Sequence, residues 1–336
     1  MSDWREAARA QQVRWKGATH TLPDEARVDG TCFRKKLGTP GQWTSHEEGP
    51  HPHCLPRAFA THNLLATIRD EALARFHRYN IAWEEETPRA GLKGDEGPTT
   101  NLLNAQVQCV NSLLSLELTP DALLTRVQTV VPGARKLVPI RHLNQAKAEG
   151  LVAFGWIGRK NYLKEKGRPE RVRGGDGTSA DALIVAEREA GRRTGILVDW
   201  AYTEPRDAAV PFISEAGVDL REVYRPLYEG PQSPFGPNKP PIDAFFQQPC
   251  DQLLRLTLLA QAMRQAKELG VDSMVVLALA PSANQAAVPT GLAAFGGTVQ
   301  GAWGAILSEP NLRLVCQDTA PWLQGTPELS ERYGGP

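Results

Sequence analysis

The sequence predicts an α/β protein whose core elements follow in the order helix, three strands, helix, strand. Three observations support this order: an amphipathic segment after residue 101, a glycine-centred hairpin over 180–202, and a helix after residue 249 that leads into an apolar strand. The 336 residues, 41% of them hydrophobic, suffice to bury a substantial core. We expect a lead-in over 1–56 and a single domain over 57–336, with its core at about 101–280.

The N-terminal elements are predicted as follows. Residues 1–56 are rich in glycine, proline, threonine and histidine with little periodicity, so we expect an irregular or partly ordered segment. Apolar residues at helical spacing predict an amphipathic helix from Asn63 to about Asn80. Asn101 can cap a second helix. Thr119-Pro120 opens a third, because proline is favourable at the first helical position.

The later elements are mainly strands. Short apolar runs bounded by glycines or turn residues predict them, and a proline-rich stretch over 230–241 predicts a loop. A glycine-rich helix over 292–307 and a last short strand are expected to pack at the edge of the sheet. The predicted strands cover 151–157, 180–186, 195–201, 273–279 and 312–316.

Two aspartates are equally distant from the turn of the hairpin. If the loop centres on Ala190, Asp181 lies opposite Asp199. Opposed residues have Cβ atoms about 5 Å apart, and like charges there are destabilising, so the pair requires a cation. Mg²⁺ suits such a site, because it takes one or two carboxylates and completes its shell with water and phosphate oxygens. The pair predicts phosphodiester cleavage with Mg²⁺ or Mn²⁺; two solvent-facing aspartates on an exposed hairpin are the alternative.

Composition limits the classes of function. The 38 basic residues equal the 38 acidic ones, so any nucleic-acid surface must be a local patch. Basic residues dominate 159–173, which suits contacts to a phosphate backbone, although a solvated loop is equally compatible. No signal segment and no run of about 18 apolar residues occurs, so we expect neither secretion nor membrane insertion. Five scattered cysteines without a Cys-x-x-Cys pair argue against a disulfide framework or zinc ribbon and fit a reducing cytoplasm.

One cluster of histidines and cysteines near the N-terminus has residue types that bind metals. It consists of His51, His53 and Cys54, with His46 and Cys32 nearby. These residues lack the paired spacings of common zinc sites. A surface cluster is therefore the favoured interpretation, and a zinc site is the alternative.

The order of the elements and the two hairpin aspartates resemble the PD-(D/E)XK nuclease superfamily, and in particular a bacterial family of restriction endonucleases. The resemblance implies a restriction-endonuclease-like core with a helical N-terminal extension and C-terminal additions. It also implies DNA as the partner, and Asp181 and Asp199 as metal ligands in the places of the first motif aspartate and the (D/E) residue. The supporting stretches are 54–56, 63–65, 68–73, 104–111, 178–182, 196–204 and 252–255.

The chain departs from the pattern of this superfamily at two positions. The superfamily has a lysine two residues after the (D/E) residue, where this chain has Ala201 on the same strand face as Asp199. A general acid or base of this kind is worth about 10²- to 10⁴-fold in rate. The family also implies an acidic residue in the first strand, near Gly155.

Other residues could compensate for these losses. Glu204, just past the second hairpin strand, could supply a further carboxylate. Gln106 matches a polar position of the family and could orient water or a metal ligand, while a helix-packing hydrogen bond is its alternative role. An amine could come from the loop before the hairpin, where ordinary solvated surface is the alternative; its candidates are Lys160, Lys164 and Lys166.

The leading hypothesis is a cytoplasmic, metal-dependent DNA endonuclease of the restriction or defence type. Its active site would contain Asp181, Asp199, Gln106 and Glu204. Because Ala201 replaces the motif lysine, the alternative is a catalytically inactive relative that binds nucleic acid or a partner protein as a regulator. No membrane partner is expected, and a homodimer remains open as the assembly.

Overall fold

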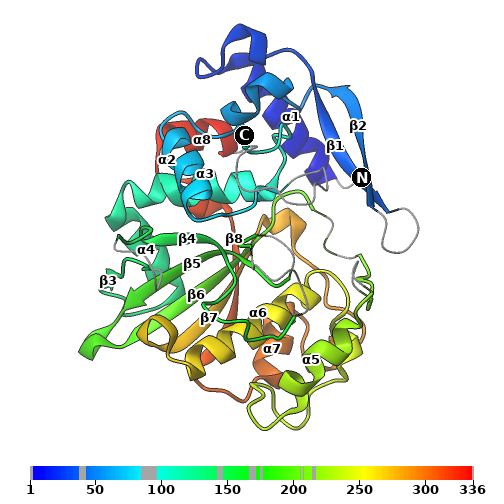
Figure 1. Ribbon diagram of the computed structural model, residues 1–336, viewed down its shortest axis with the longest axis vertical. Coiled ribbons are helices and arrows are strands. Elements are labelled where there is room, and N and C mark those ends of the chain that lie inside the picture. Colours follow the sequence, from blue (N-terminus) through cyan, green and yellow to red (C-terminus); the bar gives the residue numbers. More distant parts are fainter. Residues whose placement is uncertain are drawn as a thin grey trace.

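A mixed β-sheet forms the centre of the molecule, with helices on both of its faces (Figure 1). The computed structural model describes residues 3–37, 43–84, 97–141, 147–165, 172–174, 177–204, 206, 208–213 and 217–334. Its helices are α1 (Asp3–Ala18), α2 (Arg69–Arg78), α3 (Ala105–Glu117), α4 (Pro120–Val130), α5 (Leu220–Glu229), α6 (Cys250–Gln265), α7 (Val299–Ile306) and α8 (Pro327–Tyr333). Its strands are β1 (Gly30–Leu37), β2 (Trp43–His51), β3 (Lys136–Leu137), β4 (Val152–Trp156), β5 (Ala180–Glu187), β6 (Arg193–Trp200), β7 (Val271–Ala280) and β8 (Leu312–Asp318).

The order α3, β4, β5, β6, α6, β7 confirms the predicted core. Strands β4, β5 and β6 are antiparallel neighbours, and β6, β7 and β8 are parallel neighbours. The connection from β6 to β7 runs through α6, as parallel strands require a crossover. Helix α4 lies between α3 and β4 in the chain, and α5 precedes α6. The fold is thus a mixed α/β fold of the restriction-endonuclease-like type.

Both faces of the sheet are buried, and alternate residues of each strand serve different faces. Ile184 and Val198 pack in one hydrophobic cluster with residues of α3, whereas Leu183 and Leu197 pack in another with residues of α6. A strand covered on both sides reads as a continuous apolar run, which is why the sequence of β5 to β7 was recognisable. Asp181 interrupts this apolar run near the start of β5, and Asp199 interrupts it near the end of β6.

The expectation of an irregular segment over 1–56 is wrong, because α1 and the β1–β2 hairpin occupy it. Helix α1 buries Ala8, Gln12, Trp15 and Lys16, which lie on one helical face although two of them are polar. Gln12 exchanges hydrogen bonds with Arg332 near the end of the chain, so its polarity is satisfied by a distant segment. A hydrophobic periodicity could not reveal a face of this composition.

Two cysteines of this segment also differ from expectation. Cys32 on β1 and Cys54 after β2 are 22 residues apart in the sequence, and the structure joins them by a disulfide, with their Cα atoms 6.1 Å apart. The hairpin brings the two positions together, which spacing along the chain did not indicate. Both are buried, as is His53, so the prediction of a surface cluster is wrong for these three residues. The side chain of His46 lies outside the described part of the chain.

Two helix starts were placed too early by sequence. Helix α2 begins at Arg69, because the chain forms a 3-10 segment over Arg57–Asn63 and then a turn over 66–68. The cap of α3 is Asn104, whose side chain accepts the Val107 amide at 2.9 Å. None of the helices within the described ranges combines the length and the apolar character needed to cross a bilayer.

Candidate functional site

The two predicted aspartates lie just past the last paired residues of the hairpin register. Ala182 pairs with Val198, so the next residues along the two strands are Asp181 and Asp199, as counting from the turn predicts. The regular ladder stops at this point. The backbone N–H of Trp200 donates to the Asp181 carboxylate, Oδ2, at 2.6 Å. Asp181 therefore lies where β5 and β6 separate.

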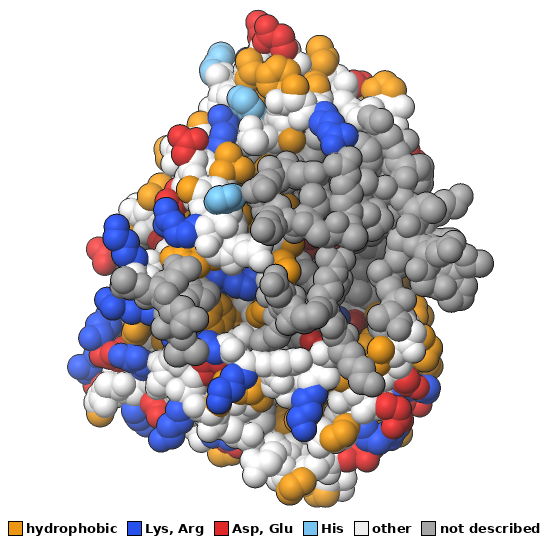
Figure 2. Space-filling model, viewed as in Figure 1, with side chains coloured by type: hydrophobic (Ala, Val, Ile, Leu, Met, Phe, Trp, Pro, Cys, Tyr) orange, Lys and Arg blue, Asp and Glu red, His pale blue; other side chains and the backbone are white. Residues whose placement is uncertain are grey.

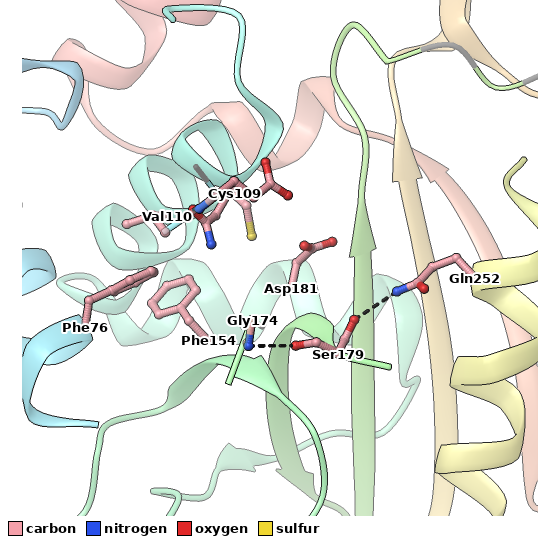
Figure 3. Close-up of a pocket in the computed structure, with 11 residues that line it drawn as sticks. Phe76, Cys109, Val110, Phe154, Gly174, Ser179, Asp181 and Gln252 are labelled. Atoms are coloured by element: carbon pink, nitrogen blue, oxygen red, sulfur yellow. Dashed lines mark hydrogen bonds between the residues drawn. The ribbon is translucent and has the colours of Figure 1, made fainter. Parts of the chain in front are cut away.

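Asp181 points into a pocket of about 150 Å³ between β5 and α3 (Figure 3). One wall is apolar and aromatic, and the polar groups approach from the N-terminal end of α3 and from β5. The pocket is lined by Phe76, Glu84, Gln106, Cys109, Val110, Phe154, Gly155, Gly174, Ser179, Asp181 and Gln252. A cavity in which a few polar groups converge around a carboxyl with a raised pKa is a candidate functional site.

Gln106 lines this pocket, but its amide is occupied by the backbone. Its Oε1 accepts the Glu84 N–H at 2.7 Å, and its Nε2 donates to the Ala82 carbonyl at 3.0 Å. Asn104 donates to the Glu84 carboxylate at 2.9 Å. These contacts match the alternative role of Gln106, a packing hydrogen bond. Through them Gln106 and Asn104 fix Glu84, a carboxylate that the sequence analysis missed because it lies in a polar loop without periodicity.

The side chain of Asp199 has its neighbours on the other side of the sheet. It is 9% exposed, and its Oδ2 lies 3.6 Å from Nη2 of Arg206. Asp251 and Arg255 of α6 are among the charges that act on it. The next residue, Trp200, packs in the core on the α3 side, and its Nε1–H donates to Oε1 of Gln108 at 3.0 Å. The convergence of Asp181 and Asp199 on one ion stays a prediction.

The electrostatics of the pocket are those of crowded acids. Burial raises the pKa of Asp181 well above its usual range, and the charge of Asp199 raises it further; the Trp200 N–H opposes this, and Glu84 and Glu204 add to it. Burial also raises the pKa of Glu204 to about 7, against hydrogen bonds from backbone N–H groups, among them those of Tyr202 and Ala105. Carboxyl groups that raise one another's pKa are stabilised by a cation among them.

The described residues of the pocket do not include three metal-ligating side chains that lie close enough to one another to bind one ion. Within the ranges that the structure describes, the set of three ligating side chains with atoms within 4.8 Å of one another lies elsewhere, at Cys32, His53 and Cys54. Mg²⁺ needs only one or two protein carboxylates. A single aspartate with one neighbouring carboxylate is therefore sufficient for it.

Comparison with known proteins decides the family. The family model described as "Restriction Endonuclease associating with ARP" matches residues 9–309. The chain belongs to this family. The search of the curated proteins and that of the solved structures gave no significant match. The matched region begins within α1 and includes the β1–β2 hairpin, so the family match covers most of the predicted lead-in.

In this member of the restriction endonuclease family, no amine stands at the place of the superfamily's lysine. Ala201 is buried, and its N–H donates to the Leu279 carbonyl at 2.8 Å, which extends the β6–β7 ladder. Lys160 and Lys164 are exposed, and neither is among the described residues that line the pocket. Lys166 lies outside the described residues.

Part of the basic stretch over 159–173, which precedes the hairpin, has a structural role. Arg173 is buried, pairs with Glu149 at 2.7 Å and lies over the ring of Trp156, so it is not available for phosphate. Lys160 and Lys164 remain exposed. On the face shown in Figure 2, basic and acidic side chains are interspersed over the described surface, in agreement with the zero net charge.

Gly155 explains why the expected acidic residue of the first strand is absent. Its φ is +57°, and a Cβ there would lie 2.9 Å from the Gly174 backbone nitrogen.

Gly155→Ala should therefore lower the free energy of unfolding by about 2–4 kcal/mol, from left-handed strain plus crowding. Gly191→Ala is the control, since Gly191 has φ +69° with nothing within 4 Å, and we expect about 1–2 kcal/mol from strain alone. Equal losses in urea unfolding would show that the backbone of Gly174 does not restrict this site.

Proposed function

We propose that the protein is a metal-dependent DNA endonuclease of the PD-(D/E)XK type with Asp181 at its active site. One observation carries the proposal: the half-buried Asp181 carboxylate lines a pocket with Glu84 where β5 and β6 separate. The charges of Asp199 and Glu204 act on the same carboxyl group. Membership of a restriction endonuclease family supports DNA as the substrate and cleavage of phosphodiester bonds as the reaction.

The donor set fits Mg²⁺ or Mn²⁺. All the candidate ligands are hard carboxylate oxygens. Oδ2 of Asp199 is buried, and Nη2 of Arg206 lies 3.6 Å from it as the neighbouring cation. We assign Asp181 and Asp199 as the ligands; Glu84 lines the pocket beside Asp181, and the charge of Asp199 acts on Asp181 from the side of the sheet that faces α6. A bound divalent ion would supply Lewis-acid activation of water and stabilisation of charge on the phosphate.

The protein's own groups orient this site and hold its protons. The Trp200 N–H fixes the Asp181 carboxylate, and Gln106 fixes Glu84. Glu204, with a pKa of about 7, can exchange a proton at its carboxyl near neutral pH. We assign Glu204 to proton transfer in place of the absent lysine.

The metal requirement tests the proposal. Purified protein should nick or cleave plasmid and phage DNA when Mg²⁺ or Mn²⁺ is supplied, and should be inactive in EDTA. Restoring the metal after chelation should restore cleavage, which separates metal loss from unfolding. Cleavage that persists in EDTA at the full rate would overturn the proposal.

Metal binding should also be measurable from the stability of the protein, without a cleavage assay. Because the pKa of Glu204 is raised from 4.5 to about 7, the folded metal-free state binds more protons between these values. Its stability should therefore fall as pH rises through this window. Mg²⁺ competes with these protons, so its stabilising effect should be larger at about pH 8 than at about pH 5.5. At a Mg²⁺ concentration of about 100 times its Kd, the gain in the free energy of unfolding should be about 2.7 kcal/mol. Thermal unfolding with and without Mg²⁺ measures this, and an equal shift at both pH values would contradict it.

A further inference from the structure

A second cluster of ligating side chains lies in the N-terminal part of the chain, outside the Asp181 pocket. Cys32, His53 and Cys54 each offer one ligand atom, and these atoms all lie within 4.8 Å of one another. The three side chains are 3%, 6% and 0% exposed. In Figure 1 the β1–β2 hairpin that carries Cys32 lies at the upper edge of the molecule, away from α5 and α7.

The side chain of His51 lies beside these three, although its ligand atoms are outside the group whose atoms all lie within 4.8 Å of one another. The ring of His51 stacks on that of His53, with centroids 5.2 Å apart. Nε2 of His51 is buried and has no hydrogen-bond partner among the residues that the structure describes. An unsatisfied buried polar atom costs about 1–3 kcal/mol. Coordination of a metal would satisfy this nitrogen, whereas a bond between the two cysteine sulfurs would not.

The backbone around the cluster is held in place. The chain turns from His51 to Cys54, where the Cys54 N–H donates to the His51 carbonyl at 3.1 Å. The Gly30 N–H donates to the Cys54 carbonyl at 3.1 Å, and the Leu102 N–H donates to that of His53 at 3.0 Å. A Cβ at Gly30 would lie 2.0 Å from the Leu55 oxygen, so only glycine permits this approach. Rigid positioning of this kind favours metal binding, since little order is lost on coordination.

The surrounding core is small. It consists of five buried residues, Trp15, Leu22, Ala26, Leu55 and Leu102, with Phe59 packed against them. Apolar clusters of this size rarely stabilise a structural unit alone, and a structural metal or a disulfide commonly supplements them.

We propose that Cys32, His53, Cys54 and His51 form a structural Zn²⁺ site. Two cysteine sulfurs and two imidazoles are the ligands of a tetrahedral structural zinc centre. The newly made chain carries both cysteines as thiols. Coordination releases their two protons and transfers no electrons, so it needs no oxidant, whereas forming the Cys32–Cys54 disulfide removes two electrons. The site is distinct from the proposed nuclease pocket, and its test does not depend on DNA cleavage.

The test uses the whole protein purified in a phosphine reductant with Zn²⁺. We expect one Zn²⁺ per chain by elemental analysis, and alkylation after denaturation in EDTA should find thiols at both Cys32 and Cys54. Replacement of zinc by Co²⁺ should give visible d–d bands of a tetrahedral site and a thiolate-to-cobalt charge-transfer band. Both measurements use the unmutated chain, so they remain decisive if variants fail to fold.

Variants then assign the ligands. His51→Gln should weaken zinc binding by more than the roughly 10- to 100-fold typical of losing a group that only orients a ligand. Cys32→Ser should diminish the charge-transfer band of the cobalt form. The controls His20→Gln and Cys316→Ser should bind zinc as the unmutated protein does, since His20 is exposed and Cys316 lies on β8. A zinc-free protein with Cys32 bonded to Cys54 under these conditions, or unchanged affinity in His51→Gln, would overturn the proposal.

Discussion

Asp181→Asn should lower the rate of metal-dependent DNA cleavage by at least about 10³-fold, because a divalent ion contributes several kcal/mol to the stabilisation of the transition state. Asparagine keeps the size of the side chain and an oxygen that can accept the Trp200 N–H, which lies 2.6 Å from the carboxylate. The loss should therefore reflect charge and not misfolding. Plasmid nicking and circular dichroism, measured on the same preparation, check both points.

Glu187→Gln is the matched control for this variant. It removes a carboxylate from the other end of the same strand, where Glu187 pairs with the exposed Lys136 at 2.8 Å. Cleavage should be unchanged, since exposed ion pairs contribute little. If Asp181→Asn cleaves as fast as this control, Asp181 is not at the active site.

Asp199→Asn tests whether Asp199 is a ligand of the same metal ion as Asp181 or only affects Asp181 through its charge. A shared ion predicts a loss comparable to that of Asp181→Asn. Asp199 already has a cationic neighbour, Arg206, on the side of the sheet that faces α6. Its assignment as a metal ligand therefore needs this separate test. A normal rate in Asp199→Asn would exclude it as a ligand and leave Asp181 and Glu84 as the pair in the pocket.

Ala201→Lys should raise the cleavage rate by about 10²- to 10⁴-fold, because it restores a general acid or base next to the metal site. Position 201 follows β6 on the strand face of Asp199, within two residues of it. Ala201→Met is the control, because it adds a side chain of similar length without an amine. The combined variant Asp181→Asn with Ala201→Lys should show no gain, since the amine needs the metal site.

The same experiment separates the two functional hypotheses. If the unmutated protein cleaves DNA and Ala201→Lys cleaves it faster, the result supports a slow enzyme in which Glu204 transfers the proton. Activity that exists only in Ala201→Lys would support a catalytically inactive relative with an intact binding site. A folded Ala201→Lys protein with an unchanged rate would contradict the idea that a missing lysine limits this site.

The sequence alone determined the features that depend on local pattern. Apolar runs and turn residues defined the hairpin, and counting from Ala190 predicted its register, which the structure shows as far as the pair of Ala182 and Val198. Periodicity likewise predicted α6 and the strand that follows it. Such signals are contained within a few residues of chain, where hydrophobic period and turn chemistry act directly.

Only the tertiary structure decided which distant groups meet. Glu84 enters the pocket because Gln106, 22 residues later, holds its backbone, and Gln12 is buried because Arg332 satisfies it. Side-chain direction was also undecided: Asp199 faces Arg206, while Asp181 faces α3. Contacts of this kind depend on how separate elements pack, and polar residues that are buried with partners leave no hydrophobic period in the sequence.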